Sequence, residues 1–384
     1  MLVTDHRSLV TIPIRNNLFG VNYNFIIVGK VYNIVFRHLQ QTGWDTLFLY
    51  IKTKKWRRAK PVIRRFVGDG VSAQQLRKYQ RWLAYAYIRY GWNFDEFFMF
   101  NFLRLSHRGR KEFVSETQRE YFCRRVNAPD TLLLFTDKGK AYQCFAKYYR
   151  RDACIVKNWQ QDEEAFVRFV ERHELFLIKP LDGAMGNGVQ IIKGEPAEKL
   201  KLRLREEYSS GFIAEELIRQ HEKMAVLHPS SVNTIRIATF RQGGKIHIVQ
   251  PFVRMGRGDA IVDNAAQGGI FGIIDIDTGT ITETSDEWGN KYVVHPDTGT
   301  PIVGYIIPEW KEALELAKEL SGVVPTCQFV GWDFAYTDDG WVVVEGNSKA
   351  QFICFQTASQ KGYRERLEKM IGMSLKKFCR QQAS

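Results

Sequence analysis

A short apolar run that leads into a glycine-rich loop constrains this chain more than any other stretch. Residues 176–190 read FLIKPLDGAMGNGVQ, in which the apolar residues predict a buried strand and Lys179 stands at its end. The loop glycines Gly183, Gly186 and Gly188 let the backbone approach a bulky anion closely. A lysine together with successive loop N–H groups indicates a triphosphate. Neither a GK[ST] ending nor a GxGxxG turn into a helix is present, and an ordinary hairpin turn is the alternative.

A second constraint lies near the C-terminal end, where GWDFAYTDDGWVVVEGN predicts a β-hairpin. Asp333 lies on its first strand, and Glu345 and Asn347 end the second. Two carboxylates and an amide oxygen on neighbouring strands suit Mg²⁺, which would neutralise phosphate charge during phosphoryl transfer. Acidic residues at strand ends are often merely solvated. However, an aspartate between Trp332 and Phe334 is costly to bury without partners.

From residue 131 onward, short apolar runs alternate with amphipathic segments, which predicts an α+β fold. A Gly243-Gly244 pair predicts a tight turn between two strands. The expected strands cover 131–135, 154–157, 176–178, 211–217, 231–241, 245–255, 269–277, 329–336 and 341–345. The expected helices cover 137–150, 162–173, 197–208, 308–321 and 361–380.

The positive charge of the chain is concentrated in its N-terminal part. The net charge is +13, yet residues 1–160 hold 29 Lys and Arg against 11 Asp and Glu, and the remainder is slightly acidic. The charge is densest in residues 52–65, KTKKWRRAKPVIRR, which could meet an anionic membrane surface or a lipid-linked or acidic glycan. Nucleic acid is disfavoured because no recognisable motif accompanies the charge. A solvated basic surface is the plain alternative.

Residues 1–130 are also rich in aromatic residues and are expected to be mainly helical. Helices are predicted on both sides of the basic run, then from Ser72 as N-cap to a stop at Gly91, and from 115 to 126.

The composition, 45% hydrophobic and 25% charged over 384 residues, indicates a soluble globular protein of two or three lobes. Its six scattered cysteines lack CxxC or histidine spacing, which predicts reduced thiols in a cytoplasmic protein, at most peripheral at the inner face of the membrane. No signal peptide is expected, and residues 25–49 are too interrupted by charge to span a membrane.

Taken in order, these motifs resemble the ATP-grasp superfamily, and in particular its carboxylate–amine ligases such as D-alanyl-D-alanine ligase and the ribosomal-protein glutamate ligases. The resemblance runs over about residues 130–375. Two segments, HPSSVNTIRIATF at 228–240 and DNAAQGG at 263–269, resemble its narrower sugar-transfer-associated branch. The implied fold has two α+β lobes that grip a nucleotide between antiparallel sheets. Its parts would be a basic helical region 1–130, a small lobe 131–218 with glycine loop and hinge, and a large lobe 219–384 with metal ligands.

The resemblance implies which residues bind ATP. Lys138 would lie near the α-phosphate and Lys179 between the α- and β-phosphates. Backbone groups of the hinge would pair with adenine, and Glu222 would hold the ribose. The implied nucleotide-binding set is Lys138, Lys179, Gly183, Gly186, Gly188, Glu215, Glu216, Leu217, Glu222, Asn264 and Gly269. For Asn233, Asn264 and Glu222 a turn or cap role is the alternative.

The resemblance also implies a catalytic set of Lys179, Arg236, Asn233 and Asp263. Arg236 would meet the transferred phosphate or the acceptor carboxylate, Asn233 would help to orient it, and Asp263 would line the γ-phosphate end. The implied ligands of two Mg²⁺ ions are Asp333, Glu345 and Asn347. The sequence departs from the ligases because no Pro-Gly turn follows the metal ligands. It also has Gly331 where an arginine is common, for which Arg236 would compensate.

The implied function is ATP-dependent ligation of a carboxylate to an amine through an acyl phosphate. The substrate would be a small molecule or glycan-linked group of sugar or amino-acid type, in surface polysaccharide synthesis. One alternative is a kinase acting on a sugar or polyol hydroxyl, with Asp263 or His228 as general base. The other is a non-catalytic nucleotide-binding module.

Overall fold

The computed structural model of this protein describes residues 58–182, 188–260, 263 and 268–379. Its chain forms two compact units, Met1–Arg89 and Tyr90–Ser384. The finer boundaries expected at residues 130 and 218 stay predictions. Everything expected of residues 1–57, including the stretch 25–49 and the start of the basic run, lies outside the described residues.

The described part of the first unit contains two helices, α3 (Ala59–Val67) and α4 (Ala73–Tyr90). Ser72 caps α4 as predicted, because its Oγ accepts the Gln75 N–H at 3.2 Å while Gln75 Oε1 accepts the Ser72 N–H at 3.0 Å. Gly91 follows α4 with φ 74°, a conformation that suits the end of a helix. The expectation that the basic run is a linker between two helices was wrong for its C-terminal part, which forms α3. Binding of the run to an anionic surface stays a prediction.

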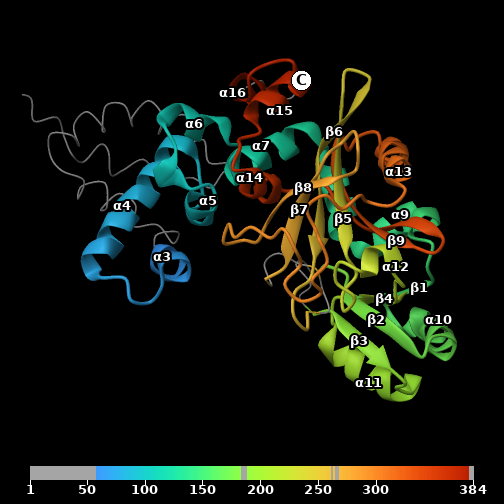
Figure 1. The fold of residues 1–384 in the computed structure, drawn as a ribbon. Helices are drawn as coiled ribbons and strands as arrows, with labels where there is room; N and C mark the ends of the chain where they lie inside the picture. Colours follow the sequence, from blue (N-terminus) through green and yellow to red (C-terminus); the bar gives the residue numbers. More distant parts are fainter. Residues whose placement is uncertain (1–57, 183–187, 261–262, 264–267, 380–384) are drawn as a thin grey trace, which may run out of the picture. The chain divides into compact units, whose positions relative to one another are not determined.

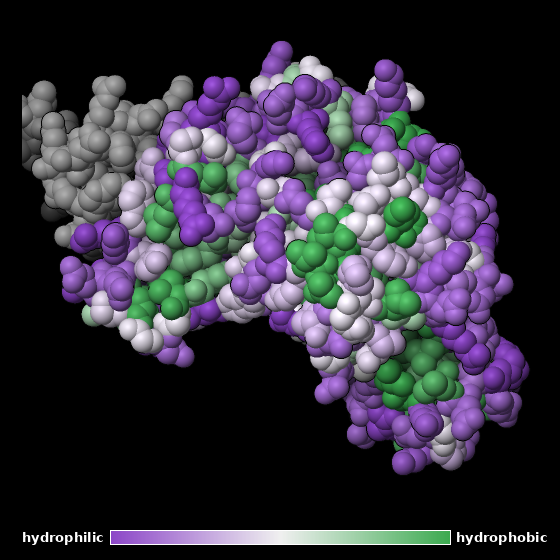
Figure 2. All heavy atoms as spheres, viewed as in Figure 1, coloured by the Kyte–Doolittle hydropathy of each residue, from purple (hydrophilic) through white to green (hydrophobic). Residues whose placement is uncertain are grey.

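A four-stranded antiparallel sheet carries the glycine-loop hairpin in the second unit. Its order is β1-β4-β2-β3, with β1 at Ala153–Val156, β4 at Phe212–Glu216, β2 at Leu175–Pro180 and β3 at Gln190–Lys193. Helices α10 (Trp159–Arg172) and α11 (Ala197–Glu207) cover one face (Figure 1). Figure 2 shows hydrophobic residues gathered among hydrophilic ones on the surface of this lobe, at the lower right.

A six-stranded antiparallel sheet forms the larger layer, in the order β10-β9-β5-β6-β7-β8. The bounds are β5 Thr234–Gln242, β6 Lys245–Met255, β7 Ile270–Ile274, β8 Ile281–Ser285, β9 Phe329–Thr337 and β10 Gly340–Asn347. The predicted strand pairs β5–β6 and β9–β10 are present, and β8 was not predicted.

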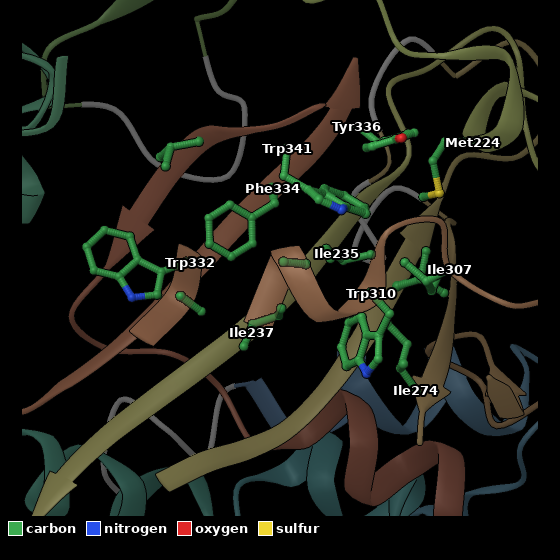
Figure 3. Close-up of a cluster of buried hydrophobic side chains, with 14 of the residues drawn as sticks. Met224, Ile235, Ile237, Ile274, Ile307, Trp310, Trp332, Phe334, Tyr336 and Trp341 are labelled. Carbon is green, nitrogen blue, oxygen red and sulfur yellow. The ribbon is translucent and has the colours of Figure 1, made fainter. Parts of the chain in front are cut away.

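Different helices pack on the two faces of the six-stranded sheet, because successive side chains along a strand point to opposite faces. Ile235, Trp332 and Phe334 pack on one face against α9 (Lys138–Tyr149) and α13 (Trp310–Val323) (Figures 1 and 3). Phe240 and Phe329 pack on the other face against helices α7 (Glu116–Val126), α14 (Ile353–Ser359), α15 (Arg364–Ile371) and α16 (Leu375–Phe378).

Three further expectations about the elements were wrong. Residues expected as a strand at 131–135 belong to helix α8 (Pro129–Thr136), which starts with a proline at its first position and an aspartate in its first turn. The helix expected at 361–380 is two helices separated at Gly372, where φ is 77°. Helix α10 begins before Asp162 and is capped by Asn158, whose side chain accepts the Gln160 N–H at 3.0 Å.

Short helices complete the second unit: α5 (Phe94–Met99), η2 (Phe102–Arg104), α6 (His107–Glu112) and α12 (Glu222–Ala225). The six cysteines form no disulfide. Among the described helices, none combines the length and apolar character that crossing a membrane requires.

Glu96 is a carboxyl group buried in the second unit. Its Oε2 accepts the Asn93 N–H at 2.6 Å, and its Oε1 accepts the Glu116 N–H at the start of α7 at 2.6 Å. Burial raises the pKa of Glu96 from 4.5 to about 8, although both backbone hydrogen bonds act in the opposite direction. At neutral pH the folded protein therefore holds this group largely protonated.

We expect Glu96→Gln to remove a pH dependence of stability. Because the folded-state pKa is raised, the contribution of Glu96 is fully present below pH 4.5 and is lost as the pH rises through about 8. Over this interval, the free energy of unfolding of the wild type should fall relative to that of the variant by up to about 1.4 kcal/mol per pH unit. Urea unfolding of both proteins measures the difference, and a difference that is independent of pH would contradict the prediction.

Candidate functional site

Lys179 and Glu215 lie on the face of the four-stranded sheet that is turned away from α10 and α11. Ile178 on β2 and Ala214 on β4 belong to the core under those helices, so the residues that follow them face the other way. Lys179 Nζ bonds to Glu215 Oε2 at 3.3 Å. Burial acts to raise the pKa of Glu215, but Arg151 and Lys179 outweigh it and hold this pKa at about 2.

Lys138 brings a second ammonium group to this face. It is the first residue of α9, and its Nζ donates to the Pro180 carbonyl at 3.2 Å. Burial lowers its pKa and nearby Lys179 lowers it further, whereas Glu345 acts to raise it. Two ammonium groups that are partly withdrawn from water and repel each other favour an anion bound between them.

The six-stranded sheet contributes three charged residues side by side. Arg236 on β5 pairs in register with Asp333 on β9, which pairs in register with Glu345 on β10. Cross-strand partners on one face stand about 4.5–5.5 Å apart between Cβ atoms. The predicted juxtaposition of the two carboxylates is therefore present, with a guanidinium as their neighbour.

A β-bulge brings Glu345 to this face. Val343 pairs with Phe334, but Glu345 pairs with Asp333, so that two steps along β10 match one step along β9. If β10 ran through Val344 without the bulge, Glu345 would share the face of Val343, which packs in the aromatic core.

Asp333 is fully buried and paired with two arginines. Arg236 donates to it through Nε and, at 2.7 Å, through Nη2, and Arg254 Nη2 donates at 2.6 Å. Burial acts to raise the pKa of Asp333, but the two guanidinium groups lower it below its usual range. Asp333 is therefore ionised and held in one orientation.

Glu345 and Asn347 complete the predicted metal-ligand set. Desolvation by the surrounding protein and the negative charge of Asp333 raise the pKa of Glu345, although the Glu345 side chain itself is 48% exposed. Asn347 Oδ1 accepts the Lys349 N–H at 2.9 Å and keeps a second lone pair.

These residues fit Mg²⁺, because a hard divalent cation prefers oxygen ligands and would relieve the repulsion between two neighbouring carboxylates. Among the described residues, no three His, Cys, Asp or Glu side chains converge as metal ligands. The set accordingly depends on the Asn347 amide.

Asp263 lies beside the row of charged residues formed by Arg236, Asp333 and Glu345. Its Oδ2 accepts hydrogen bonds from the N–H of Thr234, at 3.0 Å, and from the Thr234 hydroxyl. Arg254 Nε is 3.7 Å away and also donates to the Thr234 hydroxyl at 3.0 Å. Burial raises the pKa of Asp263 despite the attraction of Arg254.

Asn233 and His228 are occupied by contacts within the fold. Asn233 is fully buried, and its Nδ2 donates to Gln220 Oε1 and to the carbonyls of Met224 and His228 at 2.8–3.0 Å. His228 uses one ring nitrogen on Ser231 Oγ at 2.8 Å and the other on a carbonyl at 3.0 Å. These contacts favour the alternative in which Asn233 supports a turn.

The remaining predicted residues are spread along the hinge and loops. Glu216 ends β4 and accepts the Asp152 N–H at 3.3 Å, and Leu217 follows it, partly buried. Glu222 is exposed at the start of α12. Gly188 has φ 72°, and Gly269 is buried just before β7. Three predicted residues lie outside the described residues: Gly183, Gly186 and Asn264.

Gly331 explains how Arg236 fits the site. A Cβ added at Gly331 would stand 3.0 Å from Arg236 Cδ and would also collide with Ala350. The arginine side chain from the neighbouring strand therefore occupies the space beside Gly331. Its compensation for the missing arginine stays a prediction.

Sequence reasoning missed two arginines of the site, Arg151 and Arg254. The Gly243-Gly244 turn does not reveal Arg254, because a register shift between Arg236 and Ala238 lies between the turn and the pairing of Arg254 with Thr234. Arg151 carried no local signal, because its partners come from β4 and β10.

The model of a protein family described as sugar-transfer associated ATP-grasp matches residues 117–371, well over half of the chain. This chain belongs to that family. The α+β fold predicted from the resemblance is thereby confirmed, with antiparallel sheets as the two layers of the ATP-grasp fold. No curated protein sequence matches the chain.

Solved structures similar to this ATP-grasp chain are distant. N5-carboxyaminoimidazole synthetase from Staphylococcus aureus, complexed with ADP, is 14% identical with a TM-score of 0.38, covering 63% of this chain and 53% of that one. D-alanyl-alanine synthetase A from Vibrio cholerae is 9% identical with a TM-score of 0.39, covering 66% and 64%. D-Ala:D-Ser ligase from Enterococcus faecalis is 18% identical with a TM-score of 0.38, covering 64% and 60%. The chain thus spans between half and two thirds of these proteins.

Proposed function

We propose that this ATP-grasp protein is an ATP- and Mg²⁺-dependent ligase that joins a carboxylate to an amine through an acyl phosphate. One observation carries the proposal: Lys138 and Lys179 stand within electrostatic range of Glu345, which is paired across the strands with Asp333. A pair of cations next to a pair of carboxylates suits a metal–triphosphate complex, since the lysines would take the phosphates and the carboxylates the metal.

Each residue has a role in this proposal. Bound Mg·ATP would supply the phosphoryl group and the charge that neutralises it. Lys138 and Lys179 would hold the phosphates, and Asp333, Glu345 and Asn347 would hold Mg²⁺. Arg236 is fixed by Asp333 beside them, where a planar cation can orient a second oxyanion such as the substrate carboxylate. Such a site accelerates transfer mainly by positioning and preorganised charge.

A single observation supports the proposed class of substrate. The description of the family as sugar-transfer associated supports a substrate of sugar type, in keeping with the expected role in surface polysaccharide synthesis. Of the two bases considered for a kinase, His228 has both ring nitrogens engaged, which favours ligation.

Product analysis separates the possible functions. We expect ³¹P NMR and mass spectrometry of the purified protein with Mg·ATP and a panel of sugar acids, amino acids and amino sugars to show free phosphate. The product should be one water lighter than its two substrates. A phosphorylated small molecule without free phosphate would instead establish a kinase. Binding of ATP without turnover by any pair would favour a nucleotide-binding module.

A further inference from the structure

Arg151 is a buried arginine whose N–H donors are all used. Its Nε and Nη2 donate to Glu215 Oε2 at 2.8 and 2.5 Å. Its Nη1 donates to the carbonyls of Val343, at 2.6 Å, and Tyr149, at 3.4 Å, and Nη2 also donates to the Val344 carbonyl at 3.2 Å. These bonds satisfy the five N–H groups that a guanidinium carries. The side chain is only 5% exposed.

The carbonyls that Arg151 binds on β10 lie at the bulge. Strand pairing is interrupted between Val343 and Glu345, so the ladder locally lacks its usual acceptor and donor pairs. The guanidinium supplies donors to this segment immediately before Glu345. It therefore holds the backbone that presents the Glu345 carboxylate.

The carboxylate that Arg151 binds on β4 is shared. Glu215 is 4% exposed and also pairs with Lys179, whose Nζ is 3.2 Å from Glu215 Oε1. One planar group thus links the partner of Lys179, on the four-stranded sheet, to the strand that carries Glu345, on the six-stranded sheet.

We propose that Arg151 is a positioning residue that sets the Mg²⁺ ligand Glu345 relative to the phosphate-binding Lys179. The proposal rests on the proposed binding of Mg·ATP. It follows that Arg151 determines how strongly the nucleotide complex binds the metal, while contributing little to binding of the nucleotide without metal. Lysine cannot replace it, since a single ammonium cannot span Glu215 and two carbonyls.

The test separates metal from nucleotide binding in Arg151→Lys and Arg151→Gln. A fluorescent ATP analogue is titrated first in EDTA, and the complex is then titrated with Mg²⁺. We expect the Mg²⁺ concentration for half-saturation to rise by about tenfold or more, the usual effect of removing an outer-shell partner. Affinity without metal should change by less than about threefold, a small effect beside the typical charged contact.

Arg150→Lys is the matched control. Arg150 is the adjacent residue and donates to the Asp339 carbonyl at 2.8 Å, at the opposite end of the same hairpin. Its variant should leave both titrations unchanged. In a Glu345→Gln background, Arg151→Lys should no longer alter the Mg²⁺ titration, since the group that it positions is gone.

The outcomes are distinguishable. Unchanged Mg²⁺ titrations in both Arg151 variants, or equal weakening with and without metal, would overturn the positioning role. If Arg151→Lys fails to fold, the two titrations of Arg151→Gln test the positioning role instead. In that variant the buried Glu215 carboxylate still has Lys179 as an ion-pair partner. Failure of the wild type to bind the analogue would count against the proposed function instead.

Discussion

Asp333→Leu is expected to lower the free energy of unfolding by about 3–5 kcal/mol, the typical cost of removing one partner from a buried ion pair. The substitution would leave Arg236 and Arg254 facing each other without their shared carboxylate, which is 1% exposed. Leucine is close to aspartate in shape, so the loss comes from uncompensated charge rather than from a cavity. Urea unfolding monitored by tryptophan fluorescence measures the effect.

The control for this prediction lies on the same row. Glu345→Leu removes a carboxylate that is 48% exposed and whose contact with Arg236 is long, at 3.9 Å. This substitution should lower the free energy of unfolding by less than about 1 kcal/mol. Adding Arg236→Met and Arg254→Met to Asp333→Leu should recover much of the lost stability. If Asp333→Leu unfolds at the same urea concentration as Glu345→Leu, the charges of the two arginines do not need Asp333 for compensation, and the prediction is wrong.

Lys179→Met should weaken binding of Mg·ATP by about 10- to 100-fold, the range that corresponds to loss of a charged hydrogen bond. The fold should survive, because Glu215 keeps its two bonds from Arg151 when the lysine is gone. Isothermal titration calorimetry with a non-hydrolysable ATP analogue measures the change.

Lys193→Met serves as the control for this second prediction, since Lys193 is an exposed lysine at the far end of the same hairpin. It should bind the analogue as the wild type does. Equal affinity in Lys179→Met and Lys193→Met would show that the strand-end lysine does not contact the phosphates.

The features that alternation and turn chemistry control could be predicted from the sequence. The Gly243-Gly244 turn joins β5 and β6 as expected, and both glycines have positive φ. That Asp333 and Glu345 lie on neighbouring strands also followed from the hairpin, whereas the bulge that sets them opposite each other did not. Such features depend on neighbours in the chain, so a single sequence reveals them.

The features that tertiary contacts control could not be predicted. Residues 131–135 are apolar enough for a strand, yet they form a helix because Pro129 starts one and the helix packs against α9. Of the two arginines that orient Asp333, Arg236 was expected from the resemblance, whereas the position of Arg254 near the site depends on a register shift between Arg236 and Ala238. The roles assigned to individual site residues stay predictions until they are measured.

The bulge at Val344 determines which face of the sheet carries Glu345. Side chains alternate with a period of two along a strand, so one extra residue in β10 exchanges the two faces for every residue after it, relative to a strand without a bulge. In such a regular strand of the same sequence, Glu345 would share the face of Val343 and turn toward Trp332 and Phe334. An irregularity at an apolar residue thus determines on which side of the sheet a charge is available.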